Sequence, residues 1–202
     1  MQPQYFLTFA LAMLAAIVVP FILTTIVGKK KGVDKEAEAA QKAAEEEAAA
    51  EIANAEAEKN LVSENEFKAY LDGKVISLQE IGDGLAIIPS NETVCAPVSG
   101  KVTVLMPDSK HAVGMQLSNG AEILIHVGID TVSMGGEGFS YLVKVGDVVK
   151  AGQPLLKFSK AAIKKAGHPD TAFFVVTNPN GIDFKFNSGM QAKTGETVIA
   201  TC

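Results

Sequence analysis

The sequence predicts an all-β domain, folded as an antiparallel β-sandwich or barrel, behind a transmembrane helix and a helical linker. Three patterns support this organisation: an uncharged apolar stretch near the start, an alanine- and glutamate-rich segment after it, and short apolar runs separated by glycine beyond that. They divide the 202 residues into 1–31, 32–66 and 67–202. This length suits one ordinary domain with two appendages.

The first segment has the composition of a membrane-spanning helix. Residues 6–27 are uncharged and mostly apolar, and about 20 such residues span a bilayer. Lys29, Lys30 and Lys31 follow at once, which places the C-terminal side in the cytoplasm. A cleaved signal peptide, the alternative, has its basic residues before the apolar core. We therefore expect the chain at the cell membrane, with the later domain in the cytoplasm.

Residues 34–59 predict a solvated helix that spaces the domain from the membrane. Alanine and glutamate favour a helix, and the segment has no stripe of large apolar side chains. Residues 32–66 hold eleven acids against three lysines, whereas the whole chain has a net charge of −5. Residues 67–202 balance twelve acids with twelve lysines, so they lack the basic surface of a nucleic-acid-binding protein.

Short runs of valine, isoleucine and leucine predict the strands of the third segment. In chain order these runs are Gly73–Leu78, Leu85–Ile88, Thr93–Cys95, Lys101–Met106, Lys110–Leu117, Glu122–Val132, Pro154–Phe158, Ala172–Thr177 and Thr197–Ala200. Lys160–Ala166 looks helical, and Gly167 suits its C-terminal end. Many short strands with regular turns are typical of a sandwich or barrel.

A hairpin is predicted where Asn-Gly at 119–120 separates two apolar runs, because this dipeptide favours a two-residue type I′ turn. In that register His126 lies opposite Val113, and His111 lies opposite Gly128. Period-two alternation then puts both histidines on one face as diagonal neighbours. We therefore expect their side chains to lie within mutual reach.

Two converging imidazoles suit phosphoryl transfer. Neutral imidazole is nucleophilic near pH 7, and a second ring can donate to the phosphoryl oxygens. The same pair could bind zinc with Asp130 or Glu122, although the chain has no H-x-H or HExxH motif. The chain has no arginine, so no guanidinium fork holds a phosphate. The third histidine, His168, is predicted to be a surface turn residue.

Several co-linear motifs resemble the glucose-type enzyme IIA domain of the bacterial phosphoenolpyruvate-dependent sugar phosphotransferase system. They are Ala96–Gly100, Lys110–Gly114, Ile125–Val132, Gly136–Phe139, Val145–Gln153 and Val176–Asn178. The likeness runs from about Leu71 to the C-terminus. It implies that family's fold, an antiparallel β-sandwich of the duplicated hybrid-motif kind.

The resemblance also implies roles for the site residues. His126 would receive phosphate from the phosphocarrier HPr, and His111 would steady the phosphorylated ring. The remaining residues implied for the site are Ser109, Gly128 and Asp130 as supports and Val132 on the docking rim. No resident cofactor or metal is implied, with zinc at the histidine pair as the alternative.

The relay would continue outside this chain, to a cysteine on a IIB domain and then to a sugar crossing a IIC membrane domain. Cys95 and Cys202 lack the basic surroundings of a IIB cysteine and suit a reducing compartment. The membrane helix resembles the last helix of a IIC domain. The connection 79–83 is shorter than in the family, so we expect altered partner docking.

Two other functions compete with the phosphohistidine carrier. A regulatory protein-interaction module could use the same two histidines, with or without zinc. A lipoyl- or biotin-like carrier is suggested only by Gly-Asp-x-Val turns, and no lysine lies at a recognisable modified hairpin tip.

Overall fold

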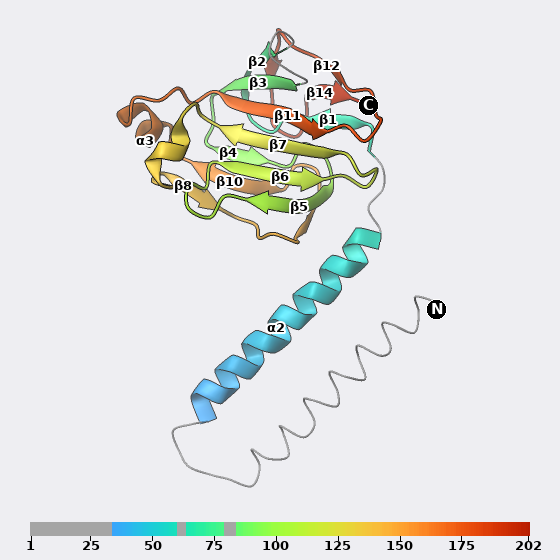
Figure 1. Cartoon of the computed structure of the whole chain (residues 1–202), viewed down its shortest axis with the longest axis vertical. Helices are drawn as coiled ribbons and strands as arrows, with labels where there is room; N and C mark the ends of the chain where they lie inside the picture. Colours follow the sequence, from blue (N-terminus) through green and yellow to red (C-terminus); the bar gives the residue numbers. More distant parts are fainter. Residues whose placement is uncertain (1–33, 60–63, 79–83) are drawn as a thin grey trace. The chain divides into compact units, whose positions relative to one another are not determined.

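A computed structural model describes residues 34–59, 64–78 and 84–202 (Figure 1). The chain divides into two compact units, Met1–Ala50 and Glu51–Cys202. No helix within the described ranges is long and apolar enough to cross a membrane. The predicted membrane segment, 1–31, and the shortened connection, 79–83, lie outside those ranges.

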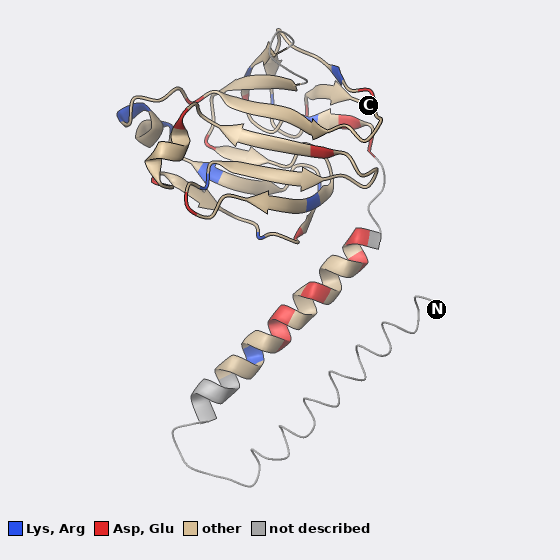
Figure 2. Cartoon of the chain, viewed as in Figure 1, with Lys and Arg blue, Asp and Glu red and all other residues tan. Residues whose placement is uncertain are grey.

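The first described element is the long helix α2 (Asp34–Lys59), which confirms the helix predicted for 34–59. Its described side chains are mostly exposed, and Figure 2 shows that most of its charges are acidic. Without an apolar face to bury, such a helix depends on the propensity of alanine and glutamate. It is solvated, as the sequence predicts.

Antiparallel strands are the main regular elements of the remaining described residues, which confirms the all-β class. The strands are β1 (Glu66–Lys68), β2 (Gly73–Ser77), β3 (Gly84–Pro89), β4 (Thr93–Cys95), β5 (Gly100–Leu105), β6 (Ala112–Gln116), β7 (Glu122–Val127), β8 (Phe139–Tyr141), β9 (Val148–Val149), β10 (Pro154–Phe158), β11 (Ala172–Asn178), β12 (Lys185–Phe186), β13 (Gln191–Ala192) and β14 (Val198–Thr201). The helical elements among them are η1 (Thr131–Met134), a 3₁₀-helix, and α3 (Lys160–Lys165). Each predicted apolar run contains a strand. The duplication of a hybrid motif stays a prediction.

Three sheets share one hydrophobic core. The largest has the order β13-β2-β3-β11-β7-β6-β5-β9, and the smaller sheets are β1-β14-β12 and β4-β10-β8. The core joins Phe174 of β11, Leu156 of β10 and Ile199 of β14, all fully buried. β7 lies between β11 and β6 inside the largest sheet, so strands on both sides fix its position.

The β6–β7 hairpin forms, but its predicted register is wrong by one residue. His126 pairs with Ala112, not with the residue after it. The loop has three residues, because the hydrogen bond that closes it runs from the Leu117 N–H to the Ala121 carbonyl at 2.9 Å. A type I′ turn needs positive φ at both central residues, whereas here the glycine, Gly120, has φ +83° and the asparagine before it has no positive φ.

The short helix α3 is confirmed, together with its predicted end. The Ser159 hydroxyl accepts a hydrogen bond from the Ala162 N–H, which caps the first turn. Gly167 has φ +84°, and the His168 N–H donates to the Ile163 carbonyl at 3.1 Å. This is the glycine-ended termination that the sequence predicts.

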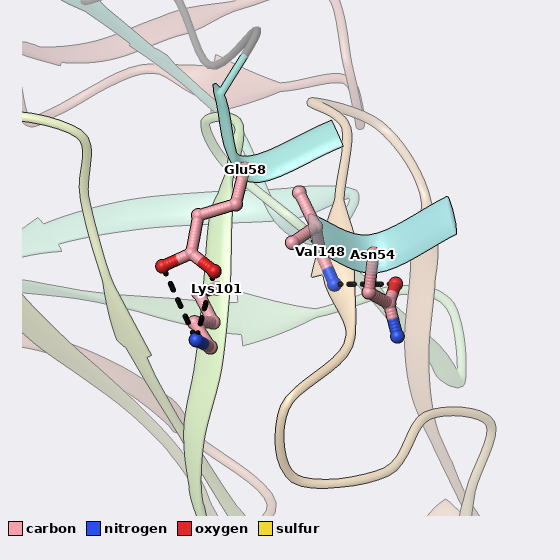
Figure 3. Close-up of polar contacts among 4 residues, drawn as sticks. All are labelled: Asn54, Glu58, Lys101 and Val148. Carbon is pink, nitrogen blue, oxygen red and sulfur yellow. Dashed lines mark hydrogen bonds and ion pairs between the residues drawn. The ribbon is translucent and has the colours of Figure 1, made fainter. Parts of the chain in front are cut away.

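The last turns of α2 contact the β-domain within the unit Glu51–Cys202 (Figure 3). Lys101 Nζ lies 2.9 and 3.1 Å from the two carboxylate oxygens of Glu58. The Val148 N–H donates to Oδ1 of Asn54 at 3.3 Å. Because Val148 is in an edge strand, β9, this asparagine satisfies a donor that the edge leaves unpaired.

Candidate functional site

His126 lies one residue before the end of β7, on the face of the sheet that points away from the core. Burial alternates along β7, with Val127 buried and His126 half-buried. On one side, Phe173 of β11 pairs with His126, and their ring centroids are 6.2 Å apart. On the other side the paired residue is Ala112, whose small side chain leaves room for a second ring.

His111 supplies that second ring. The two imidazole centroids are 4.5 Å apart, with an angle of 83° between the ring planes. The predicted convergence is confirmed, but the predicted reason is wrong. In the observed register the His111 carbonyl accepts from the Val127 N–H, so regular alternation would turn His111 toward the core. His111 lies before β6 begins and follows Lys110, which has φ +52°, so strand alternation does not fix the direction of its ring, and the ring contacts that of His126.

Ser109 orients the buried ring. Its hydroxyl oxygen lies 2.7 Å from His111 Nδ1, and only 7% of Ser109 and 5% of His111 is exposed. Because Nδ1 is occupied by this bond, Nε2 is the nitrogen of His111 that remains for other partners. The structure thus brings Ser109 together with the histidine pair, and its role as a supporting residue stays a prediction.

Tyr141, which the sequence analysis did not single out, fixes the loop that carries Ser109 and His111. Its hydroxyl donates to the Ala112 carbonyl at 2.7 Å and accepts from the Met106 N–H at 2.9 Å. The hydroxyl therefore joins both ends of the loop that contains Ser109 and His111.

Both imidazoles are held in their neutral form. Burial lowers the pKa of His111 below its ordinary value. Burial lowers the pKa of His126 as well, the charge on a protonated His111 lowers it further, and hydrogen bonds with the backbone of Gly128 and of His126 itself act in the opposite direction. A lowered pKa leaves the ring unprotonated at pH 7, which is the nucleophilic form.

Gly128 turns the chain sharply after β7. Its φ is +84°, and a Cβ added there would lie 2.2 Å from Thr131 Cγ2, so no larger residue fits without rearrangement. The Thr131 hydroxyl donates to the Val127 carbonyl at 2.6 Å, and the Gly128 N–H donates to the Thr171 carbonyl at 2.9 Å. These bonds hold the backbone beside His126 in one conformation.

The turn that follows Gly128 carries the two remaining predicted residues. Asp130 is exposed and has φ +58°, and Val132 has 61% of its surface exposed. Ile129, which the sequence analysis did not name, is 43% exposed. Exposed apolar side chains grouped in this way are typical of an interaction surface.

The site offers two metal ligands from this chain. Among the described residues, no group of three or more His, Cys, Asp or Glu side chains comes together to hold a metal ion. Neither Asp130 nor Glu122 therefore joins the histidine pair, and a zinc ion there would need further ligands from water or a partner.

Comparisons with known proteins agree on one class. The family model described as "phosphoenolpyruvate-dependent sugar phosphotransferase system, EIIA 1" matches residues 65–182. The chain is 37% identical over 144 residues to the PTS system glucose-specific EIIA component of Halalkalibacterium halodurans, covering 66% of this chain and 83% of that protein. It is 34% identical to the solved glucose permease IIA from Mycoplasma capricolum, with a TM-score of 0.59, covering 68% of this chain and 96% of that one.

A longer relative shares the same region. The chain is 40% identical over 126 residues to the PTS system glucose-specific EIICBA component of Staphylococcus carnosus, which covers 62% of this chain but only 18% of that protein.

The fold and these relatives define a phosphotransferase component, a member of the transferase class. The chain belongs to the EIIA 1 family of the phosphoenolpyruvate-dependent sugar phosphotransferase system and is a phosphocarrier of sugar uptake. The resemblance noted from the sequence motifs is thereby confirmed.

Proposed function

We propose that His126 accepts a phosphoryl group from HPr and passes it to a cysteine of a IIB domain. The observation that supports this assignment is the pair of neighbouring imidazoles, with ring centroids 4.5 Å apart. His126 is half-buried and His111 is buried. The less buried ring can meet a partner protein, and the buried ring can hold it in place.

The transfer is an in-line displacement at phosphorus. The unprotonated nitrogen of His126 attacks, a nitrogen–phosphorus bond forms, and the bond to the donor breaks with its electron pair remaining on HPr. In the next step a cysteine thiolate of IIB attacks the same phosphorus, and the electron pair returns to His126. Such a reaction depends mainly on positioning and charge stabilisation.

His111 is a positioning residue in this scheme. Ser109 occupies its Nδ1 at 2.7 Å, so a proton on Nε2 can donate to the phosphoryl oxygens. Gly128 supports the acceptor by fixing the turn after β7, because its N–H donates to the Thr171 carbonyl at 2.9 Å. Asp130 supports the turn, and Val132 with its exposed apolar side chain forms part of the surface for HPr and IIB.

Labelling with phosphoenolpyruvate, enzyme I and HPr tests the acceptor. We expect acid-labile, alkali-stable label on His126 and none after His126→Ala. Label that persists in that variant would contradict the assignment.

The helper role predicts a split between the two steps. His111→Gln should still accept phosphate from HPr but should lose onward transfer to IIB, since the ring that steadies the phosphorylated imidazole is gone. Onward transfer equal to that of the parent protein would contradict the helper role.

We also propose that the chain acts at the cell membrane, with the IIA domain in the cytoplasm and a IIC permease beside it. Lys29, Lys30 and Lys31 after the apolar residues 6–27 support this orientation, as do relatives whose names combine IIC, IIB and IIA. Carbonate extraction of membranes should leave the full chain in the pellet and release a chain that begins at residue 32.

Zinc binding by the unphosphorylated histidine pair is a second proposal, relevant to a regulatory role. It is supported only by the two imidazoles, so we expect weak binding by the isolated protein. Calorimetry with zinc chloride should show binding that His111→Gln and His126→Gln each remove. Binding that survives both substitutions would place the metal elsewhere.

A further inference from the structure

An open hollow of about 390 Å³ lies between η1, the turn after it and α3, and neither His111 nor His126 lines it. Its walls are joined. The Ser159 N–H donates to the Gly138 carbonyl at 2.8 Å, and a Cβ at Gly138 would lie 2.7 Å from the Ala162 Cβ. The hollow is therefore a fixed feature of the domain, and its volume lies within the range of small-molecule sites.

The lining combines a small apolar part with charged and polar groups. Met134, Ala162 and Ala166 supply the apolar part. Lys165 and Glu137 line the same hollow, and neither forms an ion pair with another residue in the described part of the chain. The lysine is thus available to an anion, and the carboxylate to a hydrogen-bond donor.

The remaining polar groups are Ser133 and His168, and the protonation of their contact can be worked out. The Ser133 hydroxyl donates to the Asp130 carbonyl at 2.7 Å, because a carbonyl can only accept. Its single proton is therefore used, so the 3.0 Å contact with His168 requires a proton on Nε2 of the imidazole. In the neutral ring, Nδ1 is then an acceptor, like the carboxylate of Glu137.

One ammonium group and two acceptors around a small apolar patch match a hydroxylated anion. We propose that this hollow binds a small polyhydroxylated anion of the sugar monophosphate kind, with Lys165 on the anionic group and Glu137 and His168 on hydroxyl groups. Sugar acids also combine an anionic group with several hydroxyl groups, so the experiment must distinguish sugar monophosphates from sugar acids. Binding at the hollow does not depend on the proposed role of His126.

The hollow is connected to the turn beside His126. Ser133 binds the Asp130 carbonyl twice, through its hydroxyl at 2.7 Å and its N–H at 3.1 Å. The same turn presents the exposed side chain of Val132. A ligand hydroxyl on Nδ1 of His168 leaves the contact between Nε2 and Ser133 in place. The bound ligand therefore holds Ser133 and the Asp130 carbonyl in this arrangement, and it slows phosphoryl transfer from HPr. This second consequence rests on the proposed function.

Calorimetry on the full chain tests the site with glucose 6-phosphate, gluconate, glucose and inorganic phosphate as probes. We expect saturable binding of glucose 6-phosphate, with Lys165→Ala weakening it about tenfold or more. Lys164→Ala is the matched control, since Lys164 is the adjacent exposed lysine of α3 but does not line the hollow. It should leave the affinity unchanged.

The outcomes separate the alternatives. If gluconate binds and Lys165→Ala weakens its binding by the same factor, the site is supported and its ligands include sugar acids. Absence of saturable binding by both hydroxylated anions, equal losses in Lys164→Ala and Lys165→Ala, or inorganic phosphate binding as tightly as glucose 6-phosphate would each overturn the proposal. If binding is normal but His126 takes no label from HPr, the proposed function fails and the site stands. If labelling is normal but glucose 6-phosphate does not slow it at least about threefold, the coupling is wrong.

Discussion

At the scale of single residues, the environment of His126 determines when it can act. Burial and the neighbouring His111 lower its pKa, so its ring stays neutral to a lower pH than a free imidazole. In the unfolded protein both imidazoles have their ordinary pKa of about 6.5 and take up protons at a higher pH than in the folded protein. The free energy of unfolding should therefore also decrease as the pH drops below about 6.5.

This environment predicts a pH dependence for the first transfer. Phosphate acceptance should be flat at neutral pH and should fall only as the pH drops through the lowered pKa of His126, where protonation removes the nucleophile. In His111→Gln the charge on the neighbouring ring is absent, so the pKa of His126 should rise and the fall should begin at higher pH. NMR titration of the His126 ring measures this shift. A pKa that stays the same or decreases in the variant would show that the rings are not coupled.

Gly128 provides a second test at this scale. Gly128→Ala would place a Cβ 2.2 Å from Thr131 Cγ2 in a backbone with φ +84°, and we expect a loss of at least about 2 kcal/mol of unfolding free energy. Gly146→Ala is the control, because Gly146 also has a positive φ, +94°, but a Cβ there meets no atom within 4 Å. It should lose only about 1 kcal/mol. Equal losses in chemical denaturation would mean that the contact with Thr131 is easily relieved.

At the scale of elements, the position of His111 depends on a loop rather than on a strand. The Asn-Gly dipeptide correctly predicts a hairpin, but the difference between a two-residue and a three-residue loop shifts every pair by one. His111 nevertheless contacts His126, because it lies before β6, next to the positive φ of Lys110, and does not follow that alternation. Neither the loop length nor this local turn can be read from apolar periodicity.

The conformation of the loop from Met106 to Ala112 should therefore depend on the hydrogen bonds of the Tyr141 hydroxyl. Tyr141→Phe removes the hydroxyl that joins its two ends, and we expect about 1–2 kcal/mol lower stability together with slower onward transfer to IIB. Tyr70→Phe is the control, since its buried hydroxyl donates to the Ala172 carbonyl on the core side. It should lose similar stability but keep its transfer rate. Unchanged transfer in Tyr141→Phe would show that the loop holds His111 without these hydrogen bonds.

At the scale of the whole molecule, local patterns identify the elements but not their long-range partners. Composition predicts α2 and the strands, because both signals are local. By contrast, Phe173 and Tyr141 reach the site from β11 and β8, which lie far along the chain from His111. Phe173 alternates with the core residue Phe174, so its outward face could have been inferred, whereas nothing local marks Tyr141.

The same limitation applies to the start of the domain, which the sequence places at residue 67. In the structure, Glu64 accepts from the Ser99 hydroxyl at 2.7 Å and from the Ser99 N–H at 3.2 Å, and the Asn65 carbonyl accepts from the Cys202 N–H. A chain of residues 67–202 lacks these acceptors, and it also lacks Glu66 of β1 and the contacts of Asn54 and Glu58 with the domain. We therefore expect it to be about 1–3 kcal/mol less stable than a chain of residues 51–202.

Chemical denaturation of the two truncated chains measures this difference. Glu64→Gln in residues 51–202 keeps one acceptor for Ser99 and replaces the other with an NH2 group, since the two bonds from Ser99 go to different carboxylate oxygens. It should therefore retain only part of the stability that the shorter chain loses. Glu58→Gln is the matched control: its exposed ion pair with Lys101 should contribute less than about 1 kcal/mol. If the two truncated chains unfold at the same denaturant concentration, Glu64 and Asn65 belong to the linker and the domain begins at residue 67.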